Sequence, residues 1–354
     1  MDVHNRHRRL ARQGLVATAT VLVLAATSAG CDRVSASPAA NTKTPTIGYT
    51  VYGMSSFITL GQKGVNAEAK ALGAKILWRS ANNDVNTQAA QIQSFIEQKV
   101  NAIVVAAVDA TTLAPQIKSA ESAGIPVFGV NLSLTEPAAS ELKSYVGPDD
   151  VGAGAQEAKY LAQALGGHGN VVAMQGPIDS SAELDRTKGI DQELAKYPGI
   201  RLLAIQPANW DRNQAYTLMQ NWLSRYGGKL NGVVSENDDM AIGAIRALDA
   251  AGRTNVKVVG IDGIQDGMTA VRVGQEYESN LQDAPLELGE SLAIAVRYLR
   301  GQKVPKEALL EMPPLTKATV GKYNSQMYGN FGNFLGGLPA LISKDLDSGT
   351  YAGQ

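Results

Sequence analysis

The sequence has few of the side chains on which metal binding and nucleophilic catalysis depend. Its 354 residues include a single Cys and only three His, two of which are His4 and His7 near the start. One Cys excludes an internal disulfide framework and a cysteine-rich metal site, and three His leave little imidazole for catalysis. We therefore expect a protein with no cofactor, no bound metal and no catalytic triad.

An excess of charge of one sign is also lacking. The chain has 32 Lys and Arg against 33 Asp and Glu, a formal net charge of −1, and only 6% of its residues are aromatic. Such a balance argues against a surface for nucleic acid, so we expect no nucleic-acid partner. The length suits about two domains, and the 44% of hydrophobic residues is enough for a core in each.

The first 30 residues have the pattern of an export signal. Four Arg between positions 6 and 12 precede an uncharged stretch at 14–26, which is too short for a comfortable membrane span. The segment 1–30 is therefore predicted to direct the protein out of the cytoplasm.

The end of this segment, Ser28-Ala29-Gly30-Cys31, resembles the lipobox of bacterial lipoproteins. The resemblance implies cleavage after Gly30 and a lipid anchor on Cys31. It departs from the motif at Ser28, where an aliphatic residue is usual, and ordinary secretion with a free thiol is the alternative. Residues 31–45 are small and polar and contain Pro38 and Pro45, so we expect a flexible tether that holds the body at the outer face of the membrane.

From Thr46 onward, short β-branched runs alternate with amphipathic stretches of helical length. This rhythm occurs twice, which predicts an α/β fold with two similar lobes, each a doubly wound parallel sheet. Ligands of open α/β sheets bind beyond the carboxyl ends of the strands, so the cleft between the lobes is the expected site. In the first set the strands are expected at 46–52, 74–80, 101–107 and 125–131, with helices at 61–72, 87–98 and 113–123. In the second set the strands are expected at 170–176, 200–206, 232–237 and 256–262, with helices at 187–196, 212–224, 239–252 and 265–274.

Three motifs in the second set carry a resemblance to a known family. They are QPANWDR at 206–212, SENDDMAIGAIRALDAAG at 235–252 and VKVVGIDGIQDG at 256–267. They resemble the ribose-binding branch of the type I periplasmic sugar-binding proteins, the solute receptors of sugar ABC transporters. The similarity runs from about Thr46 to Thr319. LacI-type repressors share the fold, but an export signal, and no helix-turn-helix, precedes the body here.

The resemblance implies a chain that crosses between the lobes three times and forms a three-segment hinge. The crossings are expected near 147–150, 280–284 and 312–316. The N-terminal lobe then comprises 46–148 with 283–313, and the C-terminal lobe comprises 149–282 with 314–322. Residues 323–354 form a Gly- and Asn-rich C-terminal extension beyond the family fold. Two expectations stay open for it, a disordered tail or a segment packed on the second lobe.

The resemblance also assigns ligand contacts. Sugars offer apolar C–H faces to aromatic rings and a girdle of hydroxyls to polar side chains. Trp210 and Phe57 take the aromatic positions, with Phe57 placed in the first strand-to-helix loop. The polar candidates are Asn131, Arg186, Asn237, Asp262 and Gln282. Asn237 also stands where a helix N-cap is expected, and both roles can coexist.

Three departures argue against ribose as the ligand. Asn131 and Leu132 replace an Asp-Arg pair of the relatives. Leu184 aligns with a ligand-binding Arg, although Arg186 follows it. The first loop reads GMSSF and lacks the relatives' Asn-Asn-Pro, which leaves the hydroxyls of its two serines as weaker donors. Fewer charged donors suggest a small polyol or a deoxysugar.

The function implied is capture of a sugar or small polyol and delivery to an ABC permease, without catalysis, by a monomer. One alternative is a receptor that signals to a membrane sensor. The other is an exported glycoside hydrolase, for which Asp262 and Glu236 are the one carboxylate pair we would nominate.

Overall fold

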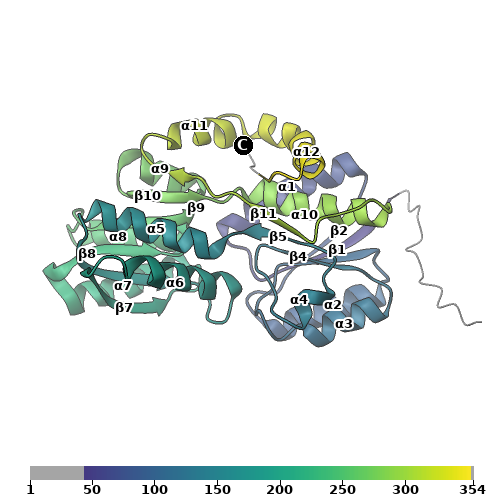
Figure 1. The fold of residues 1–354 in the computed structure, drawn as a ribbon, viewed down its shortest axis with the longest axis horizontal. Coiled ribbons are helices and arrows are strands. Elements are labelled where there is room, and N and C mark those ends of the chain that lie inside the picture. Colours follow the sequence, from purple (N-terminus) through teal and green to yellow (C-terminus); the bar gives the residue numbers. More distant parts are fainter. Residues whose placement is uncertain (1–43, 352–354) are drawn as a thin grey trace, which may run out of the picture. The chain divides into compact units, whose positions relative to one another are not determined.

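The computed structural model describes residues 44–351, and within them the chain forms two six-stranded sheets, each covered by helices (Figure 1). The strand order is β11-β5-β4-β3-β1-β2 in the first sheet and β12-β10-β9-β8-β6-β7 in the second. Neighbouring strands are parallel except β12, which runs antiparallel to β10. The predicted fold class, two similar doubly wound α/β lobes, is confirmed.

The first sheet contains β1 (Thr46–Val51), β2 (Lys75–Ser80), β3 (Ala102–Val105), β4 (Val127–Val130), β5 (Tyr145–Pro148) and β11 (Glu307–Leu310). Its helices are α1 (Ser56–Leu72), α2 (Val85–Glu97), α3 (Ala114–Ser122), α4 (Ala138–Glu141) and α10 (Ala284–Leu299). The second sheet contains β6 (His168–Gln175), β7 (Gly199–Pro207), β8 (Leu230–Ser235), β9 (Lys257–Asp262), β10 (Glu278–Leu281) and β12 (Pro314–Leu315). Its helices are α5 (Asp150–Ala164), α6 (Ser181–Leu194), α7 (Arg212–Tyr226), α8 (Asp238–Ala250) and α9 (Gln265–Val273).

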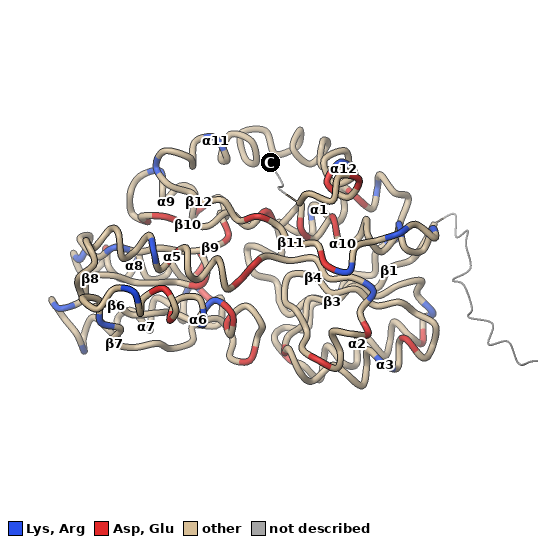
Figure 2. The backbone as a smooth tube through the Cα atoms, viewed as in Figure 1, with Lys and Arg blue, Asp and Glu red and all other residues tan. Residues whose placement is uncertain are grey.

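The chain passes between the two sheets at three places. It leaves β5 for α5 after Pro148, leaves β10 for α10 after Leu281, and leaves β11 for β12 at 311–313. The helix α10 packs against α1 and against β3, β4 and β5, so it belongs to the first lobe. Acidic residues occur near these passages (Figure 2). By sequence, Asp149, Asp283 and Glu311 lie next to the strands or helices that the passages join.

The strands at the centre of both sheets have buried apolar middles because helices cover both faces. In the first lobe β3 reads AIVV and is fully buried, and in the second lobe β8 and β9 carry Val233, Val234, Val258 and Val259, all buried. This arrangement places the polar residues that follow each strand at the ends of the sheets, where the two lobes face each other.

Two helices begin at least five residues earlier than the sequence pattern indicated. The helix α1 starts at Ser56 instead of residue 61, because the side chain of Ser55 accepts a hydrogen bond from the amide of Ile58 at 3.2 Å. Likewise, Ser180 accepts from the amide of Glu183 at 3.4 Å, which is the Ser-x-x-Glu arrangement of a capping box, and α6 starts at Ser181. Phe57 and Arg186, expected on loops, are therefore held on helices.

Residues 320–351, which we call the C-terminal arm, follow the second sheet. They form α11 (Val320–Asn324), a π-helical turn at Ser325–Gly329 and α12 (Phe331–Ser348). The first of these helices packs on α9 of the second lobe, whereas α12 packs on α1 and α10 of the first lobe (Figure 1). The arm is thus helical, which contradicts the expectation of a disordered tail. Its first part packs on the second lobe, as the other expectation had it, and α12 packs on the first lobe as well.

No helix within residues 44–351 is both long enough and apolar enough to cross a membrane. The predicted export signal, Cys31 and most of the predicted tether lie outside the described residues.

Candidate ligand-binding site

A small cavity lies where the carboxyl ends of the two sheets meet. All seven predicted site residues line it, together with three further residues: Tyr52, Phe57, Asn131, Leu132, Ala182, Arg186, Trp210, Asn237, Asp262 and Gln282. The cavity volume is about 20 Å³, which is room for about one water molecule. A sugar or polyol is larger than that, so occupation of this space requires side chains or whole lobes to move apart.

Arg186 is the cation of this cavity, and its guanidinium joins several elements. Its Nε lies 2.7 Å from the carboxylate of Asp150 on α5, and its Nη2 donates to the side-chain carbonyl of Gln282 at 2.9 Å. Its Nη1 donates to the backbone carbonyl of Glu236, and the guanidinium lies 5.7 Å from the ring centre of Trp210. Since Arg186 is only 4% exposed, these contacts fix its position.

Glu287 on α10 orients two of the predicted amide side chains. One carboxyl oxygen accepts from Gln282 at 2.8 Å and the other accepts from Asn131 at 3.0 Å. Burial raises the pKa of Glu287 to about 8, although both amides oppose this shift. The hydrogen bonds run without interruption from Asn131 in the first lobe, through Glu287, Gln282 and Arg186, to the second lobe.

Asp262 and Trp210 each bring a buried polar atom to the cavity. Asp262 is 5% exposed, its backbone has a positive φ of 124°, and its Oδ2 has no hydrogen-bond partner among the described residues. Burial is the largest cause of a pKa raised well above the usual value for this carboxyl, followed by the negative charge of Asp238. Trp210, 9% exposed, likewise has no partner for its indole N–H within 44–351. A hydroxyl can donate to the one and accept from the other.

Asn237 performs the capping role that its position before α8 suggested. Its Oδ1 accepts from the amide of Met240 at 2.9 Å, while the residue also lines the cavity.

The two serines of the first loop make contacts within the protein, and neither of them lines the cavity. Ser55 caps α1, and Ser56 donates both its amide (3.1 Å) and its hydroxyl (2.9 Å) to Asp239 in the second lobe. Their expected role as weaker donors to a ligand stays a prediction.

The comparison with known protein families decides what kind of protein carries this site. A model of the periplasmic binding protein domain matches residues 47–303. The chain belongs to this family. The resemblance stated from the motifs is confirmed, and so is the prediction that this periplasmic binding protein binds a ligand without being an enzyme.

Individual relatives give the same picture. The xylitol-binding protein of Mycolicibacterium smegmatis is 46% identical over 339 residues, which cover 96% of this chain and 95% of the relative. The ribose import binding protein of Salmonella typhimurium is 30% identical, covering 70% of this chain and 82% of its own length. Among solved structures, an ABC transporter solute-binding protein from Bacillus halodurans with bound myo-inositol has a TM-score of 0.76 at 29% identity. That match covers 80% of this periplasmic binding protein and 99% of the other chain.

The positions of Asp262 and Glu236 do not suit glycoside hydrolysis. Glu236, the nominated partner of Asp262, is fully buried and does not line the cavity. Its two carboxyl oxygens accept from the amide of Gly176 and the hydroxyl of Thr187, both at 2.8 Å. The two carboxyls therefore do not flank a common space as a glycosidase requires.

Tyr52 and Ala182 are lining residues that the sequence reasoning missed. Tyr52 is the last residue of the apolar run at 46–52, and its position at the end of a predicted strand could have identified it as a lining residue. Its hydroxyl lies 3.4 Å from that of Ser55. Ala182 lies within the Ser-x-x-Glu box that begins α6, and recognising that box would have placed it on this helix.

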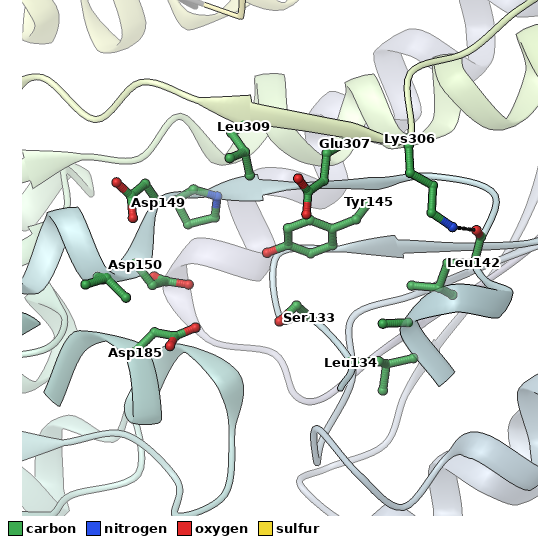
Figure 3. Close-up of a pocket in the computed structure, with 13 residues that line it drawn as sticks. Ser133, Leu134, Leu142, Tyr145, Asp149, Asp150, Asp185, Lys306, Glu307 and Leu309 are labelled. Atoms are coloured by element: carbon green, nitrogen blue, oxygen red, sulfur yellow. Dashed lines mark hydrogen bonds between the residues drawn. The ribbon is translucent and has the colours of Figure 1, made fainter. Parts of the chain in front are cut away.

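A larger pocket of about 280 Å³ lies nearby and contains none of the seven predicted residues. Figure 3 shows Tyr145 in its wall, with Asp149, Asp150 and Asp185 on one side and Lys306 on the other. The hydroxyl of Tyr145 donates to the backbone carbonyl of Asn131 at 2.8 Å, and Asp150 is paired with Arg186, so two residues of this pocket contact residues that line the smaller cavity.

Proposed function

We propose that this protein captures a small polyol between its lobes, outside the cytoplasm, and delivers it to the permease of an ABC importer. The observation that carries the proposal is the convergence of all seven predicted residues on one cavity between the two sheets. The name of the 46% identical relative, a xylitol-binding protein that matches this chain over nearly its whole length, supports a pentitol such as xylitol as the ligand.

The chemistry of the cavity supports a polyhydroxylated, uncharged ligand. Asp262 and Trp210 supply an acceptor and a donor, and Asn131, Asn237 and Gln282 supply amides that both donate and accept. The rings of Phe57, Tyr52 and Trp210 offer apolar faces to C–H groups. Leu132, which stands where ribose-binding relatives have a cation, makes one wall apolar and favours a ligand with fewer or differently spaced hydroxyls.

Binding is proposed to close the lobes by a hinge motion at the three passages of the chain. Because the cavity holds about one water in the arrangement described here, the ligand enters with the lobes apart and is enclosed when they approach. A ligand that contacts both lobes shifts the population toward the closed arrangement by the difference in its affinity for the two states.

The remaining expectations belong to the same proposal. The segment 1–30 is proposed to direct export, Cys31 to carry a lipid anchor, and residues 31–45 to tether a monomeric body at the outer face of the membrane. The proposed lobes are 46–148 with 283–313 and 149–282 with 314–322.

The lipid anchor can be tested separately from ligand binding. Cells expressing the full chain are grown with an alkyne-labelled fatty acid, and the wild type is compared with Cys31→Ser. Label on the wild type and none on the variant supports the anchor, and an unlabelled wild type contradicts it.

The ligand is tested by calorimetry and thermal shift with pentitols, hexitols, inositol, ribose and xylose. Xylitol at about 100 times its Kd should raise the free energy of unfolding by about 2.7 kcal/mol, because it binds only the folded form. The ligand should be recovered chemically unchanged. A panel in which no polyol or sugar binds would overturn the proposal, and binding of ribose in preference to every polyol would overturn the ligand class.

A further inference from the structure

The C-terminal arm has an apolar anchor on the second lobe. Val320, Tyr323 and Met327 are buried in one cluster with Met268 and Val271 of α9, and Leu281 and Leu315 complete that cluster. Burial of three large side chains on one lobe is enough to hold this part of the arm in place.

A second anchor joins the arm to the first lobe. Leu338 and Ile342 of α12 are each 1% exposed and belong to the core formed with α1 and α10. An ion pair of 2.8 Å links Arg297 of α10 to Asp347, and Lys63 of α1 lies 5.2 Å from the ring centre of Phe331. The arm therefore binds each lobe through its own set of contacts.

Between the two anchors the arm contacts the turn that follows Asp262 of the candidate site. The hydroxyl of Tyr328 donates to the backbone carbonyl of Gly263 at 3.2 Å, next to Asp262. Both residues of this turn have positive φ, 124° for Asp262 and 68° for Gly263. Such a conformation costs energy in a residue other than glycine and persists where its surroundings hold it.

We propose that the C-terminal arm is a tie that stabilises the closed arrangement of the lobes, and that Tyr328 is a positioning residue for Asp262. The proposal rests on the proposed function, since it assumes that the lobes open and close around a ligand. Rotation of α1 and α10 away from α9 would stretch the arm or detach one anchor. Both anchors can therefore keep their contacts without strain in the arm only while the lobes are together.

The tie is tested by cutting the arm between its anchors. A protease site is inserted between Gly329 and Asn330, which are exposed and separate the π-helical turn from α12. The control carries the same insertion between Gln302 and Lys303, an exposed loop of the first lobe. Each protein is compared before and after cleavage, so the uncut protein shows whether the insertion itself is tolerated.

The lobe positions are measured without ligand, which keeps this test independent of the proposed function. Nitroxide labels on Lys118→Cys in α3 and Ser224→Cys in α7, with Cys31→Ser, report the distance between the lobes. Cutting at 329–330 should lengthen this distance or add a longer population, and cutting at 302–303 should not. An unchanged distance distribution after cleavage of the arm would overturn the tie, whether or not xylitol binds.

The same pair of proteins gives a binding readout. If xylitol binds the uncut protein, its apparent Kd should rise about tenfold when the arm is cut, because a smaller fraction of the protein is closed. An unchanged Kd would count against the tie. Failure of the wild type to bind any polyol would instead overturn the proposed function.

Tyr328→Phe tests the positioning role. The ring stays and only the hydroxyl is lost, so we expect xylitol to bind roughly 3- to 10-fold more weakly, the worth of one hydrogen bond. The matched control is Tyr226→Phe, which removes a 3.1 Å bond to the carbonyl of Leu203 within the second lobe. If Tyr328 acts through Asp262, Tyr328→Phe should have no further effect in Asp262→Ala. An equal loss in both backgrounds would make Tyr328 a merely structural residue.

Discussion

Asp262 shows how one residue can be unfavourable for the fold and useful for the site. Its positive φ and its buried carboxyl oxygen without a partner both cost free energy in the protein alone. A ligand hydroxyl beside that oxygen would offset part of the cost. The main-chain carbonyl of Asp262 accepts from the amide of Gln282 at 3.0 Å, so the strained residue is fixed against the passage from β10 to α10.

Replacing Asp262 by Ala should weaken xylitol binding about 10- to 100-fold, because a buried ligand hydroxyl would lose its hydrogen-bond partner. Asp262→Asn keeps one acceptor and should lose less. The affinities are measured by calorimetry, with Asp191→Ala on the exposed face of α6 as the control. Full affinity in Asp262→Ala would remove this residue from the site.

Arg186 is placed by backbone contacts between helices as much as by its own ion pair. A Cβ on Gly154 of α5 would lie 2.1 Å from the carbonyl oxygen of Arg186, and one on Gly189 of α6 would lie 2.1 Å from that of Val151. Real contacts of this kind do not occur at such a distance, so both glycines are required for α5 and α6 to approach. This close crossing brings Asp150 within reach of the Arg186 guanidinium.

Gly189→Ala should lower the free energy of unfolding by about 1–3 kcal/mol, because the backbones of α5 and α6 must separate to make room for the added methyl group. Gly337→Ala is the matched control. It also lies in a helix, but nothing lies within 4 Å of its added Cβ, so it should be neutral or stabilising by up to about 1 kcal/mol. Both are measured by denaturant unfolding. Equal effects of the two substitutions would contradict the close crossing.

The helix α10 carries buried carboxyls whose pKa values are raised in the folded protein. Burial raises the pKa of Glu290 to about 8, helped by the charge of Asp345 on α12 and of Glu287 on α10 and opposed by Arg297. Burial raises the pKa of Glu68 on the adjoining α1 to about 7, again opposed by Arg297. Because the folded protein holds these protons and the unfolded chain releases them near its ordinary pKa, the stabilisation is complete below about pH 4.5 and is lost as the pH rises toward 8.

Glu290→Gln should therefore raise the free energy of unfolding at pH 8, by about 1–3 kcal/mol, since the amide has no charge to bury. At pH 5 the difference should be small, because Glu290 is then already protonated in the folded protein. Urea unfolding of wild type and variant across pH 5–8 measures both. Glu307→Gln, an exposed acid on β11, is the control. A gain that is the same at pH 5 and pH 8 would show that titration of Glu290 is not its source.

The sequence predicted most elements because their apolar periodicity is unambiguous where both faces of a strand are buried. It failed at helix starts that depend on capping, as at Ser55 and Ser180, and at the arm. The arm contains several glycines within α12, and its helicity depends on packing against two lobes that local composition does not describe. The seven site residues came from the resemblance to a known family. The chain of hydrogen bonds through Glu287 could not be found in this way, because Glu287 looks like an ordinary residue in the first turn of α10.

The proposed closure of the two lobes would depend on contacts that form only when the lobes are together. The bonds from the Ser56 amide and hydroxyl to Asp239 join the N-terminus of α1 to α8 across the two lobes. Asp239 is held at its second-lobe position by Arg212 at 2.5 Å, and Arg212 is paired in turn with Asp266. The N-terminus of a helix favours a carboxylate, which strengthens this contact.

Ser56→Ala removes the hydroxyl donor but leaves the helix cap Ser55, so the first lobe should stay intact while closure becomes less favourable. We expect xylitol to dissociate roughly 3- to 10-fold faster, with association little changed, because the contact forms after the ligand has entered. Stopped-flow kinetics separate the two rates. Ser119→Ala, whose hydroxyl bonds to Pro115 within the first lobe, is the control. A slower association with unchanged dissociation would mean that the Ser56 contact acts before the lobes close. This contact would then not stabilise the closed arrangement.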